Sequence, residues 1–138
     1  MANVQSIKNK RDELEVMCQV QSIDVVCLTE TWTKEKDQNC DITIPGFSII
    51  NRMDKATLSG VGGGNVILAR DGTKMVGGAN DITTGTGSYI QATKSELIGP
   101  NLKVSIVNVY RSPAKDTEQP SLSALEKIIR ESGNNAII

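Results

Sequence analysis

The fold of this chain is decided by residues 23–32, which read IDVVCLTETW. The first six of these residues, Ile23–Leu28, are nearly all apolar and rich in β-branched side chains, as expected of a strand that is covered on both faces. Polar residues return abruptly at Thr29, and Glu30 follows directly. The stretch therefore predicts a buried strand with a carboxylate just beyond its carboxyl end.

The residues before this strand predict an amphipathic helix over Ser6–Gln21, with Ser6 or Asn9 as its cap. Apolar residues recur at spacings of three, four and seven along one face of this helix, and charged residues occupy the rest. The apolar residues are Ile7, Leu14, Met17 and Cys18.

Further strands are predicted after residue 32. A turn within Ile42–Ile50 leads into a short strand, and Val66–Ala69 is a second buried strand. The segments Tyr89–Leu97 and Leu102–Tyr110 form a hairpin. Apolar residues of the second segment point to both sides, so we expect both of its faces to be buried.

The C-terminal part predicts a helix after a charged loop at Pro113–Pro120. Its apolar stripe is expected to contain Leu122, Leu125, Ile128 and Ile129. Gly133 is placed to end it. The last five residues, Asn134–Ile138, read as the opening of another buried strand.

Strands interleaved with helices, with apolar runs on both faces, indicate an α/β or α+β sandwich. A length of 138 residues fits one domain. No repeat or linker divides the chain, so we predict a single domain over residues 1–138. Only one strand follows a complete helix, which favours a truncated domain whose remaining strands lie elsewhere.

Composition excludes several classes of site. The chain has no histidine, which excludes histidine-based triads and histidine-ligated zinc. Its net charge of −1 argues against a broad electrostatic grip on nucleic acid, although a compact metal-assisted site is compatible with it.

The three cysteines are too few and too widely spaced for a zinc cluster, so we expect reduced thiols, with Cys18 and Cys27 in the core. No membrane span or leader is evident, which predicts a cytoplasmic or nuclear protein.

Glu30 is the most informative position, because a carboxylate beyond a strand end projects into the crevice where sheet proteins collect ligands. A hard oxygen ligand there suits Mg²⁺. The alternative is that Glu30 solvates the strand end or pairs with a lysine. Tyr110 and Arg111 end a later strand, where they could contact a phosphate; the alternative is a tyrosine at the rim beside a solvated arginine.

The glycine-rich run at residues 60–64 does not predict a nucleotide-binding loop. Phosphate loops of that type follow a strand and open a helix, whereas this run opens a strand, and Asn65 replaces the third glycine of the fingerprint. We expect a tight turn in which backbone segments approach closely.

Five blocks of sequence, read in order, resemble one family. They are NVQSIKNK at residues 3–10, DVVCLTETW at 24–32, IPGF at 44–47, GGG at 62–64 and VYRSP at 109–113. The family is the endonuclease/exonuclease/phosphatase superfamily, specifically the apurinic-type endonuclease domain of non-LTR retrotransposon polyproteins, which also carry a reverse transcriptase. The resemblance extends from Asn3 to Ile138 and covers the first part of the family's domain.

The resemblance implies an incomplete four-layer α/β sandwich and magnesium-dependent hydrolysis of phosphodiester bonds in DNA. It makes Glu30 the metal-binding carboxylate, Asn3 a polar partner that orients metal or phosphate, Tyr110 a phosphate-side active-site residue and Arg111 its neighbour on the substrate rim. The family's Gly-Asp-Phe-Asn and Ser-Asp-His segments would lie after Ile138. We therefore expect a weak metal site, weak DNA binding and little or no cleavage by the chain alone.

Two alternatives stay open. One is a non-catalytic remnant or binding module that keeps metal, DNA or protein contacts. The other is a small-molecule phosphoesterase relative, which would need the same additional residues. A half sandwich would expose an apolar sheet face, so self-association through that face is also expected.

Overall fold

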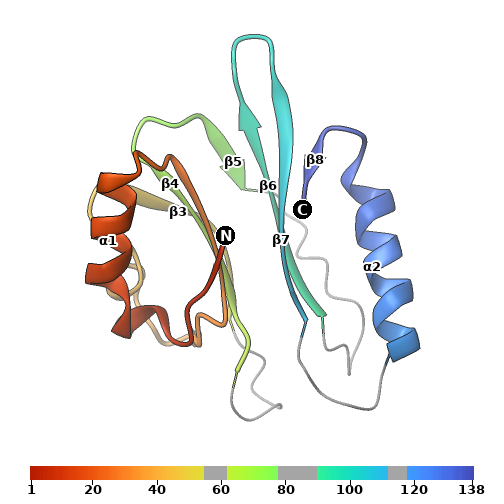
Figure 1. Cartoon of the computed structure of the whole chain (residues 1–138), viewed down its shortest axis with the longest axis horizontal. Helices are drawn as coiled ribbons and strands as arrows, with labels where there is room; N and C mark the ends of the chain where they lie inside the picture. The colour runs from red at the N-terminus through yellow and green to blue at the C-terminus, as the bar shows by residue number, and fades with distance from the viewer. Residues whose placement is uncertain (55–61, 78–89, 112–117) are drawn as a thin grey trace.

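The computed structural model describes residues 1–54, 62–77, 90–111 and 118–138, without side-chain detail for 118–122. Two four-stranded sheets stack on each other, α1 covers the outer face of one, and α2 covers the outer face of the other (Figure 1). The predicted four-layer α/β sandwich is therefore confirmed. Tyr89, the first residue of the predicted hairpin, and residues 113–117 of the predicted charged loop lie outside the described residues. The loop is shorter than predicted, because the helix that follows it already begins at Glu118.

The first sheet has the strand order β1-β2-β4-β3. β1 runs parallel to β2, and the other neighbours are antiparallel. The strands are β1 (Ala2–Asn3), β2 (Val25–Thr29), β4 (Asn65–Arg70) and β3 (Phe47–Met53). A short 3₁₀ helix, η2 (Asn39–Asp41), precedes β3. The predicted buried strands at 23–28 and 66–69 are confirmed to within two residues at either end.

The second sheet has the order β5-β6-β7-β8, with β8 parallel to β7 and the other pairs antiparallel. Its strands are β5 (Met75–Gly77), β6 (Ile90–Ile98), β7 (Lys103–Arg111) and β8 (Ala136–Ile137). The predicted hairpin is confirmed as β6 and β7. β5, which is only three residues long, was not predicted.

The N-terminal helix is shorter than predicted. A 3₁₀ turn, η1 (Ile7–Asn9), comes first, and α1 (Arg11–Val20) begins after Lys10. The amides of Ser6 and Ile7 donate to the carbonyls of Glu30 and Thr31, so this stretch continues the line of β1 instead of entering the helix. Of the two predicted caps, Ser6 holds the N-cap position of η1 and Asn9 caps neither helix, while Lys10 holds the N-cap position of α1. Neither Ser6 nor Lys10 makes a side-chain cap hydrogen bond.

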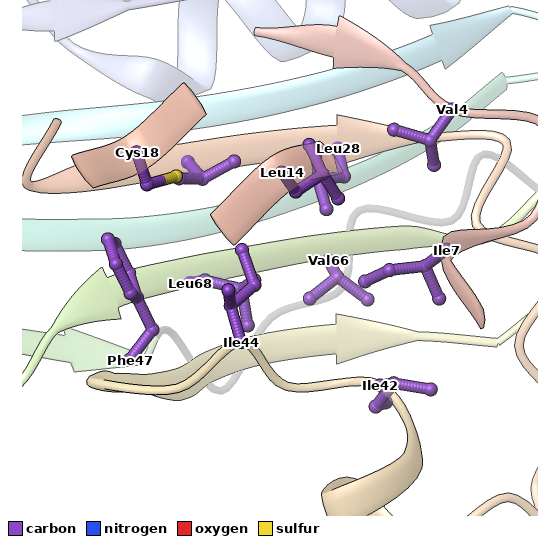
Figure 2. Close-up of a cluster of buried hydrophobic side chains, with 11 residues drawn as sticks. Val4, Ile7, Leu14, Cys18, Leu28, Ile42, Ile44, Phe47, Val66 and Leu68 are labelled. Atoms are coloured by element: carbon purple, nitrogen blue, oxygen red, sulfur yellow. The ribbon is translucent and has the colours of Figure 1, made fainter. Parts of the chain in front are cut away.

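The largest apolar core lies between α1 and the first sheet (Figure 2). Leu14 and Cys18 of α1 face Leu28 of β2 and Val66 and Leu68 of β4. The same cluster includes Val4, Ile7, Ile42, Ile44 and Phe47 from the neighbouring segments. Cys18 and Cys27 are buried free thiols, as predicted, and Cys40 is an exposed one.

β7 is buried on both faces, again as predicted. Val107 points toward α2 and packs with Ile128, while Ile106 points toward the first sheet and packs with Cys27 and Ile67. The expectation of an exposed apolar sheet face is wrong for the described residues, because the inner faces of the two sheets cover each other.

The C-terminal helix α2 spans Glu118–Ser132, and Gly133 follows it with a φ of +82° that most residues avoid. Of the predicted stripe, Ile128 is fully buried, whereas Ile129 is 58% exposed and points away from the sheet. The side chain of Leu122 lies outside the described residues. β8 is the strand predicted at 134–138, but Ile137 and Ile138 are exposed because β8 lies at the sheet edge. Neither α1 nor α2, the α-helices of the described residues, has the length and hydrophobicity of a membrane span.

Candidate functional site

The candidate site begins where β2 ends. β2 stops at Thr29, and the chain continues between two flanking segments that hold its backbone. On one side the amide of Ser6 donates to the carbonyl of Glu30 at 2.9 Å. On the other side the amides of Thr31 and Trp32 donate to the carbonyls of Gly64 and Gly63. Residues 30–32 are therefore fixed in place although they lie outside the regular strand.

The backbone of this segment is strained. Glu30 has a φ of +56° and Trp32 a φ of +55°. Both values lie in the left-handed region, which residues other than glycine rarely adopt. Such conformations persist where surrounding contacts enforce them, and they cluster at functional sites. The side chains of these two residues are joined by a hydrogen bond.

The carboxylate of Glu30 accepts hydrogen bonds from three directions. Trp32 Nε1 donates to Oε2 at 2.6 Å, and the amide of Gly63 donates to the same oxygen at 3.0 Å. The side chain of Tyr110 also hydrogen bonds to this carboxylate. Burial alone would raise the pKa of Glu30, but the hydrogen bonds from Tyr110, Trp32 and Gly63 outweigh it and leave the pKa below its ordinary value. Glu30 is therefore a carboxylate anion at neutral pH.

The glycine run approaches this carboxylate closely. Gly62 has a φ of +110°, and a Cβ on it would lie 3.1 Å from Glu30 Oε2. The expectation of a tight turn with close backbone approach is thus confirmed for the described part, residues 62–64. The run supplies an N–H donor to a side chain, at the start of β4.

Tyr110 reaches the site from the other sheet. It lies near the end of β7, directly opposite Gln91 of β6. Gln91 adds a second connection between the sheets, because its Oε1 accepts a hydrogen bond from the amide of Gly64 at 2.7 Å. The site is therefore built at the boundary of the two sheets, with the acidic group from one and the phenol from the other.

Asn3 and Arg111 lie near the same end of the strands. Asn3 is exposed, ends β1 and is paired in register with Thr29, the residue before Glu30. Arg111 is exposed and pairs with Ile90, whose side chain faces α2. Because neighbouring residues of a strand point to opposite faces, Arg111 and Tyr110 leave β7 on different sides. The structure thus joins Glu30 with Tyr110 and places Asn3 and Arg111 at the margin.

The residues that hold Glu30 were not predicted from the sequence. Trp32 belongs to the block at residues 24–32, but no role was predicted for it. A tryptophan two residues after an acidic residue indicates a hydrogen bond between the two side chains only when the backbone is known to turn there. Gly63 acts through its backbone, and Gln91 resembles any polar residue of an alternating strand. Neither carries a signal of its own in the sequence.

This chain is similar to several solved structures. The endonuclease domain of TRAS1, a telomere-specific non-LTR retrotransposon, matches with a TM-score of 0.65 and 15% identity, over 98% of this chain and 55% of that one. The AP endonuclease LMAP from Leishmania major matches with 0.64 and 16%, over 94% and 45%. TDP2 from D. rerio, in complex with single-strand DNA product, matches with 0.53 and 15%, over 94% and 51%.

The chain has the fold of the endonuclease/exonuclease/phosphatase superfamily. It spans about half the length of the solved structures it matches. No protein-family model and no curated protein matches the sequence.

The endonuclease/exonuclease/phosphatase fold raises the question whether the site can bind a metal ion. The side chains that could act as metal ligands answer it in part. Among the residues that the structure describes, no group of three His, Cys, Asp or Glu side chains could hold an ion. Magnesium is often bound through one or two carboxylates while waters and substrate oxygens complete its shell. The ionised Glu30 fits such a site with one protein carboxylate, and Asn3 offers a neutral oxygen from the adjacent strand end.

Proposed function

We propose that this chain carries the metal-binding and phosphate-binding part of a site that hydrolyses phosphodiester bonds in DNA, with magnesium as the metal. The observation that carries the proposal is the Glu30 carboxylate, kept ionised by three hydrogen-bond donors at the end of β2. The fold it sits in is that of two endonucleases and of a protein crystallised with a DNA product.

Each candidate residue has a role in this proposal. Glu30 holds the metal, and Asn3 orients the metal or a phosphate oxygen from the neighbouring parallel strand. Tyr110 faces the phosphate and holds the Glu30 side chain in place. Arg111 contacts the more distant substrate backbone from the rim. Bound magnesium would supply Lewis-acid polarisation of a phosphate oxygen.

We further propose that the 138-residue chain by itself cleaves DNA slowly or not at all. Hydrolysis needs a group that activates water, and loss of that group from a cooperative site costs several orders of magnitude in rate. The resemblance assigns this task to an Asp and a His, and the 138 residues contain no histidine.

The test has two readouts on one set of proteins. The first is the change in the emission of Trp32 on addition of Mg²⁺, because this single tryptophan is bonded to Glu30. The second is magnesium-dependent nicking of supercoiled plasmid. The variants are Glu30→Ala and, as a matched control, Glu35→Ala, which removes an exposed carboxylate of the loop after Trp32.

The expected results separate the two parts of the proposal. The wild type and Glu35→Ala should respond to Mg²⁺ and Glu30→Ala should not; equal responses in all three would overturn the metal site. Nicking should stay near background in every protein. Nicking by the wild type that disappears in Glu30→Ala would support the metal site and overturn the proposed inactivity.

A second candidate function is self-association as a binding module. The specific observation is that the two edge strands of the described second sheet, β5 and β8, carry exposed Val76 and Ile137. Edge strands present unpaired backbone groups that pair readily with another chain. Sedimentation velocity tests this: a species that grows with concentration supports it, and a monomer at all concentrations contradicts it.

A further inference from the structure

Two buried asparagines lie between the sheets, one from each sheet. Asn65 begins β4 and Asn108 lies in β7, and both are completely buried. Asn65 Nδ2 donates to the carbonyl of Gln91 at 2.9 Å, with a longer contact to that of Asn108 at 3.3 Å. In return, Asn108 Nδ2 donates to the carbonyl of Leu28 at 2.8 Å, with a longer contact to that of Val66 at 3.4 Å. Each amide binds the backbone of the opposite sheet.

The orientation of both amides is fixed by these contacts. Every partner of the two nitrogens is a carbonyl oxygen, which accepts hydrogen bonds and cannot donate them, so neither amide can be turned around. The two amide oxygens have no hydrogen-bond partner in the described part of the chain. A buried unpaired oxygen is unfavourable, and apolar side chains would serve stability alone better. The two asparagines are therefore better explained by a role in fixing the position of one sheet relative to the other.

That position bears directly on the candidate site. Leu28, which Asn108 binds, lies two residues before Glu30 in the chain, and Asn108 itself lies two residues before Tyr110. Since residues two apart on a strand share a face, Asn108 and Tyr110 leave β7 on the same side, toward the first sheet. The contact of Asn108 with Leu28 thus sets where Tyr110 stands relative to Glu30.

We propose that Asn65 and Asn108 form a reciprocal clamp between the two sheets that positions Tyr110 for its hydrogen bond to Glu30. Both are positioning residues, since they act through Tyr110. The functional importance of the clamp rests on the proposed function. The clamp explains how a site assembled from two sheets keeps its geometry. The contacts that define the clamp do not depend on that function.

The single tryptophan gives a direct probe of the clamp. Its indole N–H is the group that donates to Glu30 Oε2, and it produces one resolved signal in a proton–nitrogen NMR spectrum. In Asn108→Leu, which has a similar shape without the donor, we expect this signal to shift in the same direction as in Tyr110→Phe. In the double variant the signal should stay where Tyr110→Phe alone puts it, because the clamp acts through the tyrosine hydroxyl.

Thr93→Val is the matched control. Thr93 lies directly opposite Asn108 on β6, is equally buried, and its hydroxyl has no hydrogen-bond partner among the described residues. Replacing it removes a buried polar group from the same place without breaking a cross-sheet bond. The indole signal of this variant should remain at the wild-type position.

Two results would overturn the clamp. One is an unshifted indole signal in folded Asn108→Leu, and the other is a double variant in which the two shifts add, since additivity means that Asn108 does not act through Tyr110. If Asn108→Leu does not fold, Asn108→Thr is tested in its place, because threonine suits a strand and keeps one hydroxyl donor. An indole shift of the same sign as in Tyr110→Phe but smaller supports the clamp, and an unshifted indole signal overturns it. The readout uses neither metal nor DNA, so a failed nicking or metal test leaves the clamp standing.

Discussion

The indole nitrogen of Trp32 donates a hydrogen bond to Oε2 of Glu30 across 2.6 Å, between residues only two apart in sequence. An extended strand would point both side chains to the same face but at a greater separation. The contact is made possible by the left-handed backbone at both residues. This contact joins Trp32, the one tryptophan of the chain, to Glu30, the candidate metal ligand.

Trp32→Phe is the first prediction from this contact. Phenylalanine keeps an aromatic ring and removes the donor, so the Glu30 anion loses one of its three hydrogen bonds. Because the carboxylate is partly exposed, we expect the free energy of unfolding to fall by roughly 1 kcal/mol. Urea denaturation followed by circular dichroism measures it, and an unchanged midpoint would show that the bond contributes nothing.

The second prediction concerns acid. The pKa of Glu30 is lowered by its donors, and the pKa of Asp37 is lowered by the side chain of Lys8 and by the amide of Lys34. A carboxyl group with a depressed folded-state pKa adds stability above its ordinary pKa, about 4.3 for Glu and 3.9 for Asp. That stability is lost as the pH falls through the lower folded values.

Glu30→Gln isolates the first of these contributions. The variant cannot ionise, so its urea midpoint should decline less between pH 6 and pH 3 than that of the wild type. In Asp37→Asn the urea midpoint should likewise decline less than in the wild type over this pH range. The two effects should be separate, because Glu30 and Asp37 have different hydrogen-bond partners. Wild type and Glu30→Gln with the same acid sensitivity would refute the assignment.

The third prediction compares two glycines with similar backbone angles. Gly62 has a φ of +110° and Gly72 a φ of +92°, so an alanine at either place costs about 1–2 kcal/mol of backbone strain. A Cβ at Gly72 meets nothing within 4 Å, whereas at Gly62 it presses on the carboxylate of Glu30. Gly62→Ala should therefore lose more stability than Gly72→Ala and alone change the emission of Trp32.

The fourth prediction tests which face of α2 is buried. Ile128 is fully buried against β6 and β7, so Ile128→Ala should lower the free energy of unfolding by about 2–5 kcal/mol. Ile129 is mostly exposed, and Ile129→Ala should stay within about 0.5 kcal/mol of the wild type. Thermal unfolding of the two variants distinguishes the observed face from the stripe predicted by sequence, which included both.

Hydrophobic periodicity was sufficient for the elements whose burial is strong and local. β2, β4 and the β6–β7 hairpin were found because their side chains are covered on both faces, and α2 was found through its stripe. The start of α1 was missed because the amides of Ser6 and Ile7 bind the carbonyls of Glu30 and Thr31, residues far along the chain. β5 was missed because three residues at a sheet edge leave no periodic pattern.

For the site, sequence reasoning located the acid and left out what surrounds it. Glu30 stands at an abrupt change from apolar to polar residues, which a single sequence displays. Its partner Gly63 acts through a backbone amide, and Gln91 binds the glycine turn through a contact between sheets. Such contacts follow from the packing of the two sheets and have no pattern along the chain.

Each sheet of this sandwich is drawn from one continuous half of the chain: the first from residues 2–70 with α1, the second from residues 75–137 with α2. The strands of the first sheet therefore all precede those of the second sheet along the chain. The strands of each sheet pair only with strands from the same half of the chain. The entropic cost of bringing distant segments together therefore falls mainly on one step, the packing of the two sheets against each other. The Glu30–Tyr110 contact joins the two sheets, so it can form only when the sheets have packed together.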